Sequence, residues 1–145
     1  MNKIKIFTDG AARGNPGPSA IGVVVEAGGI KKTYREFIGY ATNNEAEYKA
    51  LIFALQKIKL IYGKAKSKNL FLECHLDSEL IVRQLNHQYK VVEENIQKLF
   101  LVLWNLMIDF REVKCAHVPR AKNTEADRLA NLALDEATRA QSRMF

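Results

Sequence analysis

The sequence predicts an α/β domain in which helices pack on the faces of a mixed β-sheet. Two observations support this class. Segments with the period of a strand and segments with the period of a helix follow one another in the order βββαβααβα. The chain has 145 residues, enough for one domain with a substantial core, and no internal repeat or linker divides it. We therefore expect a single domain over residues 1–145.

Three strands and a long helix are expected first. KIKIFTD alternates polar and apolar residues, and Gly28-Gly29 is a strong two-residue hairpin signal between the next two strands. The helix is indicated by apolar residues at helical spacing, namely Leu51, Ala54, Leu55 and Ile58. The expected strands are 3–9, 20–27 and 30–39, and the expected helix is about 45–60.

The second half of the chain adds two strands and three helices. NLFLECHL reads as a strand, and a helix starts near Ser78. An apolar-rich helix follows over 93–107, DFREVKCAHV reads as the last strand, and an amphipathic helix covers about 125–137. The tail, about 137–145, is expected to fray.

The composition is that of a basic globular protein. A net charge of +6 and a pI near 9.4 favour an anionic partner, nucleic acid first, although many basic proteins have no such partner. No signal segment and no apolar run of membrane-spanning length occur, so we expect a cytoplasmic protein with no membrane partner. Cys74 and Cys115 lack metal-ligand spacing and are expected to be buried thiols.

Two aspartates directly end predicted strands. Asp9 ends KIKIFTD, and Asp77 ends NLFLECHL where the chain passes into a helix. Ligands of open α/β sheets gather beyond the carboxyl ends of strands, so both positions suit a functional acid. Each also has a structural interpretation, because Asp9 suits a turn that bonds its own backbone and Asp77 suits a helix N-cap.

Two further acids, Glu47 and Asp127, lie in the first turns of predicted helices. Each heads an apolar stripe that should face the sheet. A carboxylate on an inward face is costly unless a cation or hydrogen-bond donors compensate it. The alternative is a capping box, formed by Asn44 with Glu47 or by Thr124 with Asp127.

Convergence of all four acids would require a compensating charge. Clustered carboxylates repel one another unless divalent cations lie between them, and hard oxygen ligands suit Mg²⁺ or Mn²⁺. Two such ions about 4 Å apart form a clamp for in-line attack on a phosphodiester. Because spacing alone does not prove convergence, the residues by themselves lead to the hypothesis of a metal-dependent nuclease.

Four blocks of the sequence, in order, resemble those of ribonuclease H, type 1: TDGAARGNPGP, TNNEAEYKAL, LDSELIVRQLN and HVPRAKNTEADRLAN. The resemblance covers nearly the whole chain and implies a ribonuclease H-like fold with a five-stranded mixed sheet. It also implies a monomeric endonuclease that hydrolyses the RNA strand of RNA/DNA hybrids and leaves 5′-phosphate and 3′-OH ends. Activity on double-stranded RNA stays open. Two Mg²⁺ or Mn²⁺ ions are expected at Asp9, Glu47, Asp77 and Asp127.

The same resemblance implies a role for the glycine-rich loop, residues 10–17. The loop is expected to lie in the minor groove of the hybrid, with Asn15 near the ribose hydroxyls, the groups that distinguish RNA from DNA. The start of the first helix is expected to bind the hybrid backbone. The expected substrate-binding residues are Gly10, Ala12, Arg13, Asn15, Thr42, Asn43, Asn44, Arg120 and Lys122. For Arg120 and Lys122 the alternative is a solvated basic loop.

His117 lies ten residues before Asp127, the spacing of the family histidine that assists proton transfer or product departure. VPRAK follows it, a stiffer and more basic segment than the glycine-containing loop of many members. Two further departures are Glu79, where a glutamine often contacts substrate, and the absence of a basic helical handle before the last strand. The rival interpretations are an enzyme that cuts double-stranded RNA or DNA junctions and a non-catalytic hybrid-binding module.

Overall fold

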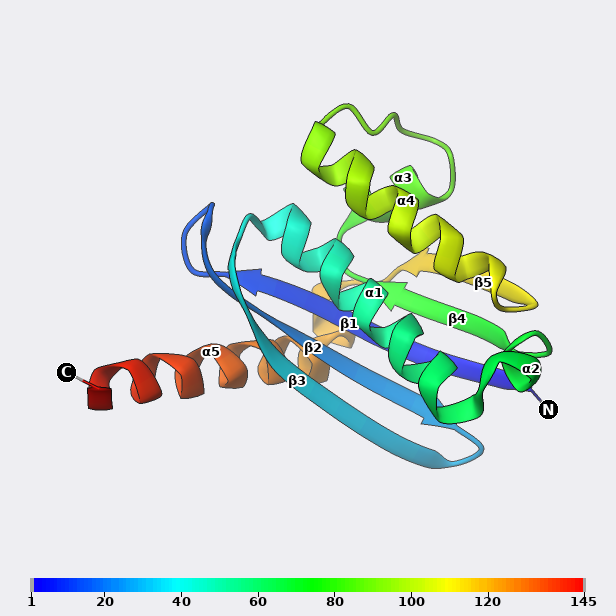
Figure 1. The fold of residues 1–145 in the computed structure, drawn as a ribbon, viewed down its shortest axis with the longest axis horizontal. Coiled ribbons are helices and arrows are strands. Elements are labelled where there is room, and N and C mark those ends of the chain that lie inside the picture. The colour runs from blue at the N-terminus through cyan, green and yellow to red at the C-terminus, as the bar shows by residue number, and fades with distance from the viewer. Residues whose placement is uncertain (1, 145) are drawn as a thin grey trace.

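The computed structural model describes residues 2–144, which form a five-stranded sheet with helices on both faces (Figure 1). The expected fold class is confirmed. In chain order the elements are β1 (Lys3–Ala12), β2 (Gly17–Ala27), β3 (Ile30–Ala41), α1 (Asn43–Tyr62), α2 (Lys64–Ser67), β4 (Phe71–Leu76), α3 (Glu79–Leu85), α4 (Glu94–Ile108), β5 (Glu112–His117), a 3₁₀ turn (Arg120–Lys122) and α5 (Thr124–Met144).

The strand order across the sheet is β3-β2-β1-β4-β5. The first three strands pair antiparallel as two hairpins, whereas β1, β4 and β5 run parallel. The carboxyl ends of β1, β4 and β5 therefore meet at one edge of the sheet, where the predicted acids cluster. α1 packs on β1 and β2 from one side, and α5 packs on β2 from the other (Figure 1).

The main core lies on the face of the sheet that α1 covers. The predicted stripe of α1 is fully buried there, at Leu51, Ala54, Leu55 and Ile58. Smaller apolar clusters lie under α5, where Ala133 and Leu134 pack with Ala20. Cys74 and Cys115 are buried register partners on β4 and β5, and both are free thiols, as expected.

The structure differs from expectation at β1, α2 and α5. β1 continues to Ala12 because Gly10 to Ala12 still pair with β2. The short helix α2 was not expected. α5 continues to Met144 instead of ending near 137, since no glycine or proline interrupts 124–144 and the Thr138 hydroxyl donates to the Leu134 carbonyl at 2.9 Å.

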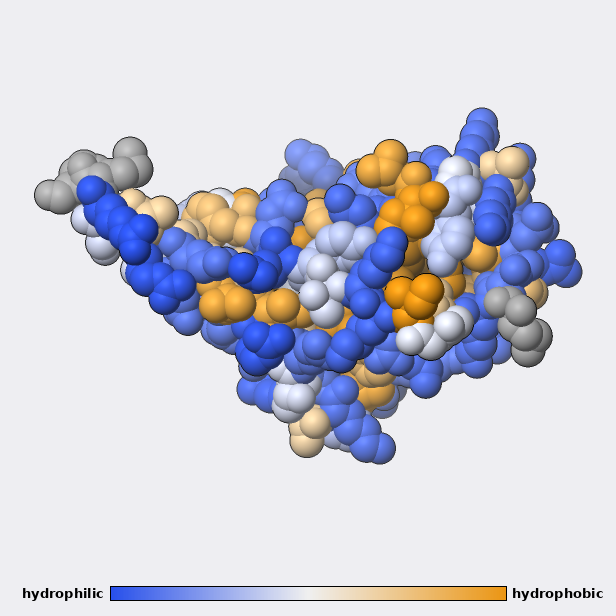
Figure 2. Space-filling model, turned by 90° about the horizontal axis from the view of Figure 1, so that it is seen from below, coloured by the Kyte–Doolittle hydropathy of each residue, from blue (hydrophilic) through white to orange (hydrophobic). Residues whose placement is uncertain are grey.

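Two further observations concern the helices. Residues 86–93 join α3 directly to α4, so no basic handle lies between these helices. No helix within residues 2–144 is long and apolar enough to cross a membrane. Hydrophilic side chains cover most of the face seen in Figure 2, with apolar patches between them, and the last turns of α5 project beyond the sheet (Figure 1).

Candidate active site

Asp9 lies where β1 separates from β4. The parallel pairing with β4 ends at Phe7 and His75, whereas the antiparallel pairing with β2 continues through Asp9, which faces Gly22. The side chain of Asp9 is only 7% exposed. Asp9 is therefore held in β1 by its pairing with β2, at a position where β4 no longer pairs with β1. It is not a turn residue.

Glu47 reaches Asp9 from the first turns of α1. Thr42 is the N-cap of this helix, because its hydroxyl accepts the Glu45 N–H at 3.1 Å and the Glu45 carboxylate accepts the Thr42 N–H at 2.8 Å. The alternative in which Asn44 caps α1 with Glu47 is therefore wrong. Because Glu45 forms the capping box with Thr42, the Glu47 carboxylate is available to the site.

Glycine at position 10 allows α1 to come this close to β1. A Cβ on Gly10 would lie 2.2 Å from the carbonyl carbon of Ala46, a distance no side chain tolerates. At this contact the Gly10 N–H donates a hydrogen bond to Glu47 Oε1. The other oxygen, Oε2, is buried and has no hydrogen-bond partner among residues 2–144.

Asp77 follows β4 immediately and completes a group of three carboxylates. Ser78, not Asp77, caps α3, since its hydroxyl accepts the Ile81 N–H at 3.4 Å. Asp9, Glu47 and Asp77 each offer an oxygen, and these three oxygens lie within 4.8 Å of one another. The N-cap interpretation of Asp77 is therefore wrong, and two strand ends and one helix converge on a single site.

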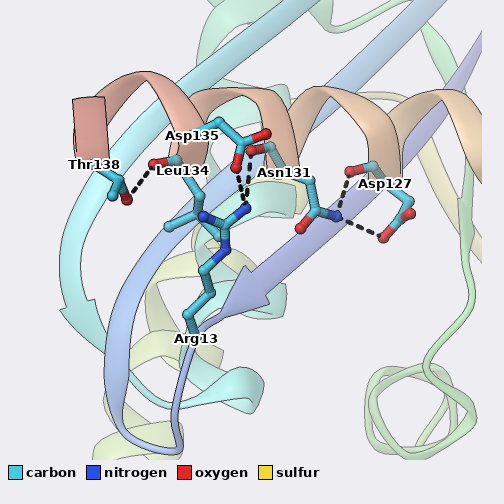
Figure 3. A network of polar contacts seen from close by, with 6 residues as sticks. All are labelled: Arg13, Asp127, Asn131, Leu134, Asp135 and Thr138. Carbon is cyan, nitrogen blue, oxygen red and sulfur yellow. Dashed lines mark hydrogen bonds and ion pairs between the residues drawn. The ribbon is translucent and has the colours of Figure 1, made fainter. Parts of the chain in front are cut away.

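Asp127, the fourth predicted acid, lies in the first turn of α5. Asn131 donates to both the backbone carbonyl and the carboxylate of Asp127, at 3.0 and 3.2 Å (Figure 3). Asp127 does not belong to the group within 4.8 Å, although a hydrogen bond between its side chain and Asp9 helps to raise the pKa of Asp9. It lies at the margin of the site.

The close packing of acids changes their protonation. Burial raises the pKa of Asp9 far above its ordinary value, and the negative charges of Glu47 and Asp77 raise it further. Burial also raises the pKa of Glu47, opposed by the neighbouring Asp9 carboxyl group, by the hydrogen bond from the Gly10 N–H and by the charge of Arg120. Without a cation, the raised pKa favours the protonated form of Asp9. A divalent cation fits here, because it would compensate the buried charge and give Glu47 Oε2 a partner.

Comparison with known proteins agrees with this geometry. A family model described as "Reverse transcriptase-like" matches residues 7–133. LC11-RNase H1, isolated from compost and solved in complex with an RNA/DNA hybrid, is 41% identical with a TM-score of 0.87, covering 93% of this chain and 99% of that chain. The chain belongs to the type 1 ribonuclease H family.

Two curated relatives are longer than this member of the ribonuclease H family. Ribonuclease HI of Halobacterium salinarum is 39% identical over 137 residues, which cover 93% of this chain and 66% of the relative. A bifunctional protein of Mycobacterium tuberculosis is 39% identical over 142 residues, which cover 95% of this chain. The match spans only 37% of the M. tuberculosis protein.

Predicted substrate-binding residues of the glycine-rich loop and of the start of α1 form a hydrogen-bond network at the exposed edge of the site. Asn15 Oδ1 accepts the Asn43 N–H at 3.1 Å, and Asn43 Oδ1 accepts the Ala12 N–H at 3.2 Å. The glycine-rich loop and the start of α1 are thereby held together. Asn44 lies beside them in the first turn of α1, partly exposed and not engaged as a cap.

Arg13 points away from this network. Its guanidinium pairs with Asp135 and contacts the Asn131 carbonyl at 3.4 Å, so that the loop is tied to α5 (Figure 3). Both side chains of the ion pair are substantially exposed, so the pair is open to exchange with solvent or a phosphate.

The chain between β5 and α5 carries the remaining predicted residues. His117 is exposed at the end of β5, where it is the register partner of Leu76, the residue before Asp77. Arg120 and Lys122 are exposed on the 3₁₀ turn that follows. Glu79 pairs with Arg83 one turn along α3 and is outside the acid group, so it is not a fourth member of the cluster.

Sequence reasoning missed Asn123. Its side chain is buried and donates to the Thr8 carbonyl at 2.9 Å and to Asp77 Oδ2 at 3.2 Å. The only signal in the sequence was an asparagine directly before a helix, which is equally typical of an ordinary N-cap.

Proposed function

We propose that this chain is an endoribonuclease that hydrolyses the RNA strand of RNA/DNA hybrids with two Mg²⁺ or Mn²⁺ ions. The observation that carries the proposal is the convergence of Asp9, Glu47 and Asp77 within 4.8 Å beside the loop network of Asn15 and Asn43. Family membership supports it, and so does the relative solved with an RNA/DNA hybrid.

Asp9, Glu47, Asp77 and Asp127 would hold the ions. Bound divalent cations would activate a water for attack on the phosphodiester and stabilise the leaving 3′-oxygen. The Gly10 N–H fixes one oxygen of Glu47, and the other oxygen has no hydrogen-bond partner among residues 2–144. Asn131 holds the Asp127 carboxylate at the margin in the same way. These fixed carboxylates keep the site preorganised without substrate.

His117 is proposed to move a proton. It lies at the exposed end of β5, where it is the register partner of Leu76, the residue before Asp77. Histidine titrates in the range needed to take a proton from an attacking water or to give one to the leaving oxygen. An exposed ring also allows the products to leave.

Hybrid recognition is proposed to occur along the edge formed by the glycine-rich loop and the start of α1. Asn15 and the backbone of Gly10 and Ala12 would meet the ribose 2′-OH groups, which both donate and accept hydrogen bonds. Thr42, Asn43 and Asn44 place a helix N-terminus where phosphates would pass. Arg120 and Lys122 would contact phosphate on the other side, and Arg13 would do so by exchanging Asp135 for a phosphate.

Several finer features stay predictions. They are the 5′-phosphate and 3′-OH ends of the products, activity on double-stranded RNA, the monomeric state, the single domain and a cytoplasmic location. A non-catalytic hybrid-binding module is disfavoured, because a pure binder gains nothing from buried carboxylates next to phosphates.

The test is hydrolysis of a hybrid with labelled RNA in Mg²⁺ by the wild type, by Asp77→Asn and by Asp109→Asn. Asp109 pairs with Lys59 outside the acid cluster, so its substitution is a chemically matched control. We expect the wild type and Asp109→Asn to produce RNA fragments whose 3′ ends a DNA polymerase extends on the DNA strand. Asp77→Asn should produce none. Equal activity in all three proteins would contradict the proposal.

A further inference from the structure

Asn123 connects three parts of the candidate site through one residue. Its side chain is 2% exposed. Nδ2 donates to the carbonyl of Thr8, the residue before Asp9, and to Oδ2 of Asp77. Its backbone carbonyl accepts the Asp127 N–H at 3.2 Å. The residue therefore fastens β1, the end of β4 and the first turn of α5 to one another.

The orientation of the Asn123 amide follows from the chemistry of its neighbours. The Thr8 carbonyl and the Asp77 carboxylate are both acceptors, so only the NH₂ group satisfies them. The reversed amide would place Oδ1 against two oxygens. The two hydrogen bonds therefore do not depend on an arbitrary choice between nitrogen and oxygen.

An ordinary helix cap does not explain Asn123. A capping asparagine uses its side-chain oxygen to accept an N–H from the first turn of the helix. Here Oδ1 is buried and accepts no hydrogen bond from any of residues 2–144. A buried amide with an unpaired oxygen costs stability, so the start of α5 does not account for this side chain, whereas the two hydrogen bonds of its NH₂ group do.

We propose that Asn123 is a positioning residue that sets the orientation of Asp77 and its place relative to Asp9. The proposal rests on the proposed function, since it assigns the orientation of carboxylates that would hold metal. Without the Nδ2 hydrogen bond, the Asp77 carboxylate loses the only hydrogen-bond donor it has among the described residues. It would then turn freely, and the preorganised oxygen group would loosen.

The experiment measures metal binding without substrate. Wild type, Asn123→Ala and Ser67→Ala are titrated with Mg²⁺ while the melting temperature is recorded. Ser67 is the matched control, because it is buried and donates one hydrogen bond to the Gly63 carbonyl at the far end of the molecule. We expect the Mg²⁺ concentration for the half-maximal rise to increase on the order of 10- to 100-fold in Asn123→Ala only.

Two further measurements separate positioning from simple destabilisation. In hydrolysis of a hybrid at fixed Mg²⁺, Asn123→Ala should lower kcat by a similar factor and leave KM for the hybrid within about twofold. In the Asp77→Asn background, Asn123→Ala should add no further change in the Mg²⁺ response, because the residue acts through Asp77. If Asn123→Ala does not fold, Asn123→Ser retains one donor and should show an intermediate Mg²⁺ response.

The inference is overturned if the Asn123 variants melt lower but respond to Mg²⁺ as the wild type does, or if the wild type shows no Mg²⁺ response. Because these titrations need no cleavage, the result is distinguishable from failure of the proposed function. A wild type that responds to Mg²⁺ but cuts no hybrid would refute only the proposed function.

Discussion

At the scale of single residues, Asp9 and Glu47 place two carboxyl groups in a site with little water. Both are 7% exposed, and burial raises the pKa of each. An isolated buried pair of this kind opposes folding once both groups are ionised. A bound cation would remove this cost, which makes the metal-free protein the informative state to study.

The first prediction concerns stability against pH without metal. Because the folded pKa of Asp9 lies above its unfolded value of about 4, the protonated form contributes stability that is fully present below about pH 4. This contribution is lost as the pH rises through the raised folded pKa. We expect the melting temperature of Asp9→Asn minus that of the wild type, in chelator, to increase from pH 5 to pH 8. A constant or falling difference would contradict the raised pKa.

Asp9→Asn also tests the role of the carboxylate itself. The amide keeps the size of the side chain but loses the charge that would hold a cation, so we expect no detectable hydrolysis and a folded circular dichroism spectrum. Loss of that spectrum would instead assign Asp9 a structural role. Asp135→Asn, on the exposed surface of α5, should keep most of the activity.

His117→Ala tests the proton-transfer role at the end of β5. General acid–base groups typically contribute 10²- to 10⁴-fold, so we expect kcat to fall on the order of 100-fold. Hybrid affinity, measured in chelator, should be unchanged because His117 is not part of the loop network. Unchanged kcat across pH 6 to 9 would exclude this role.

At the scale of elements, two glycines set how closely helices approach the strands that carry the acids. Gly10 lets α1 contact β1, and Gly22 lets α5 contact β2, where a Cβ would lie 2.0 Å from the Ala126 carbonyl oxygen. The helix that supplies Glu47 and the helix that supplies Asp127 thus both approach β-strands at positions without side chains.

Gly10→Ala should push β1 and α1 apart and disturb stability and activity together. Overpacking of this kind costs roughly 1–3 kcal/mol, and displacement of the Gly10 N–H would release Glu47. We expect a lower unfolding free energy by chemical denaturation and a weaker Mg²⁺ response. Gly28 lies in the exposed β2–β3 turn at φ +57° with open space around it, so Gly28→Ala strains the backbone without a clash. It is the control that lowers stability and leaves the Mg²⁺ response unchanged. An equal Mg²⁺ response in both variants would contradict the account.

The helix starts show why the sequence left the roles of the acids open. N-x-x-E from Asn44 and T-x-x-E from Thr42 are overlapping patterns, and only the position of the true first turn separates them. The structure assigns the cap to Thr42 and frees Glu47. Likewise Ser78 caps α3 and frees Asp77. Differences of one or two residues in a helix boundary lie within the ordinary uncertainty of local patterns.

At the scale of the whole molecule, the chain order of strands and helices was predictable from periodicity, apart from the short helix α2. The three-acid convergence agrees with the family motifs. Contacts between distant segments were not predictable. The pairing of Arg13 with Asp135 was not foreseen, and Asn123 was not recognised because its hydrogen bonds join α5 to β1 and to the end of β4. No local pattern encodes such contacts, since they depend on how the finished layers stack.

The most direct measurement is cleavage of one 5′-labelled RNA strand presented alone, paired with DNA and paired with RNA, each with Mg²⁺, Mn²⁺ or chelator. We predict cutting of the strand paired with DNA in either metal and none in chelator, because the carboxylate group needs a cation and the loop network suits a hybrid groove. Cutting of the RNA duplex in addition would indicate looser groove recognition. No cutting by folded protein in either metal would contradict the central claim and leave a hybrid-binding module.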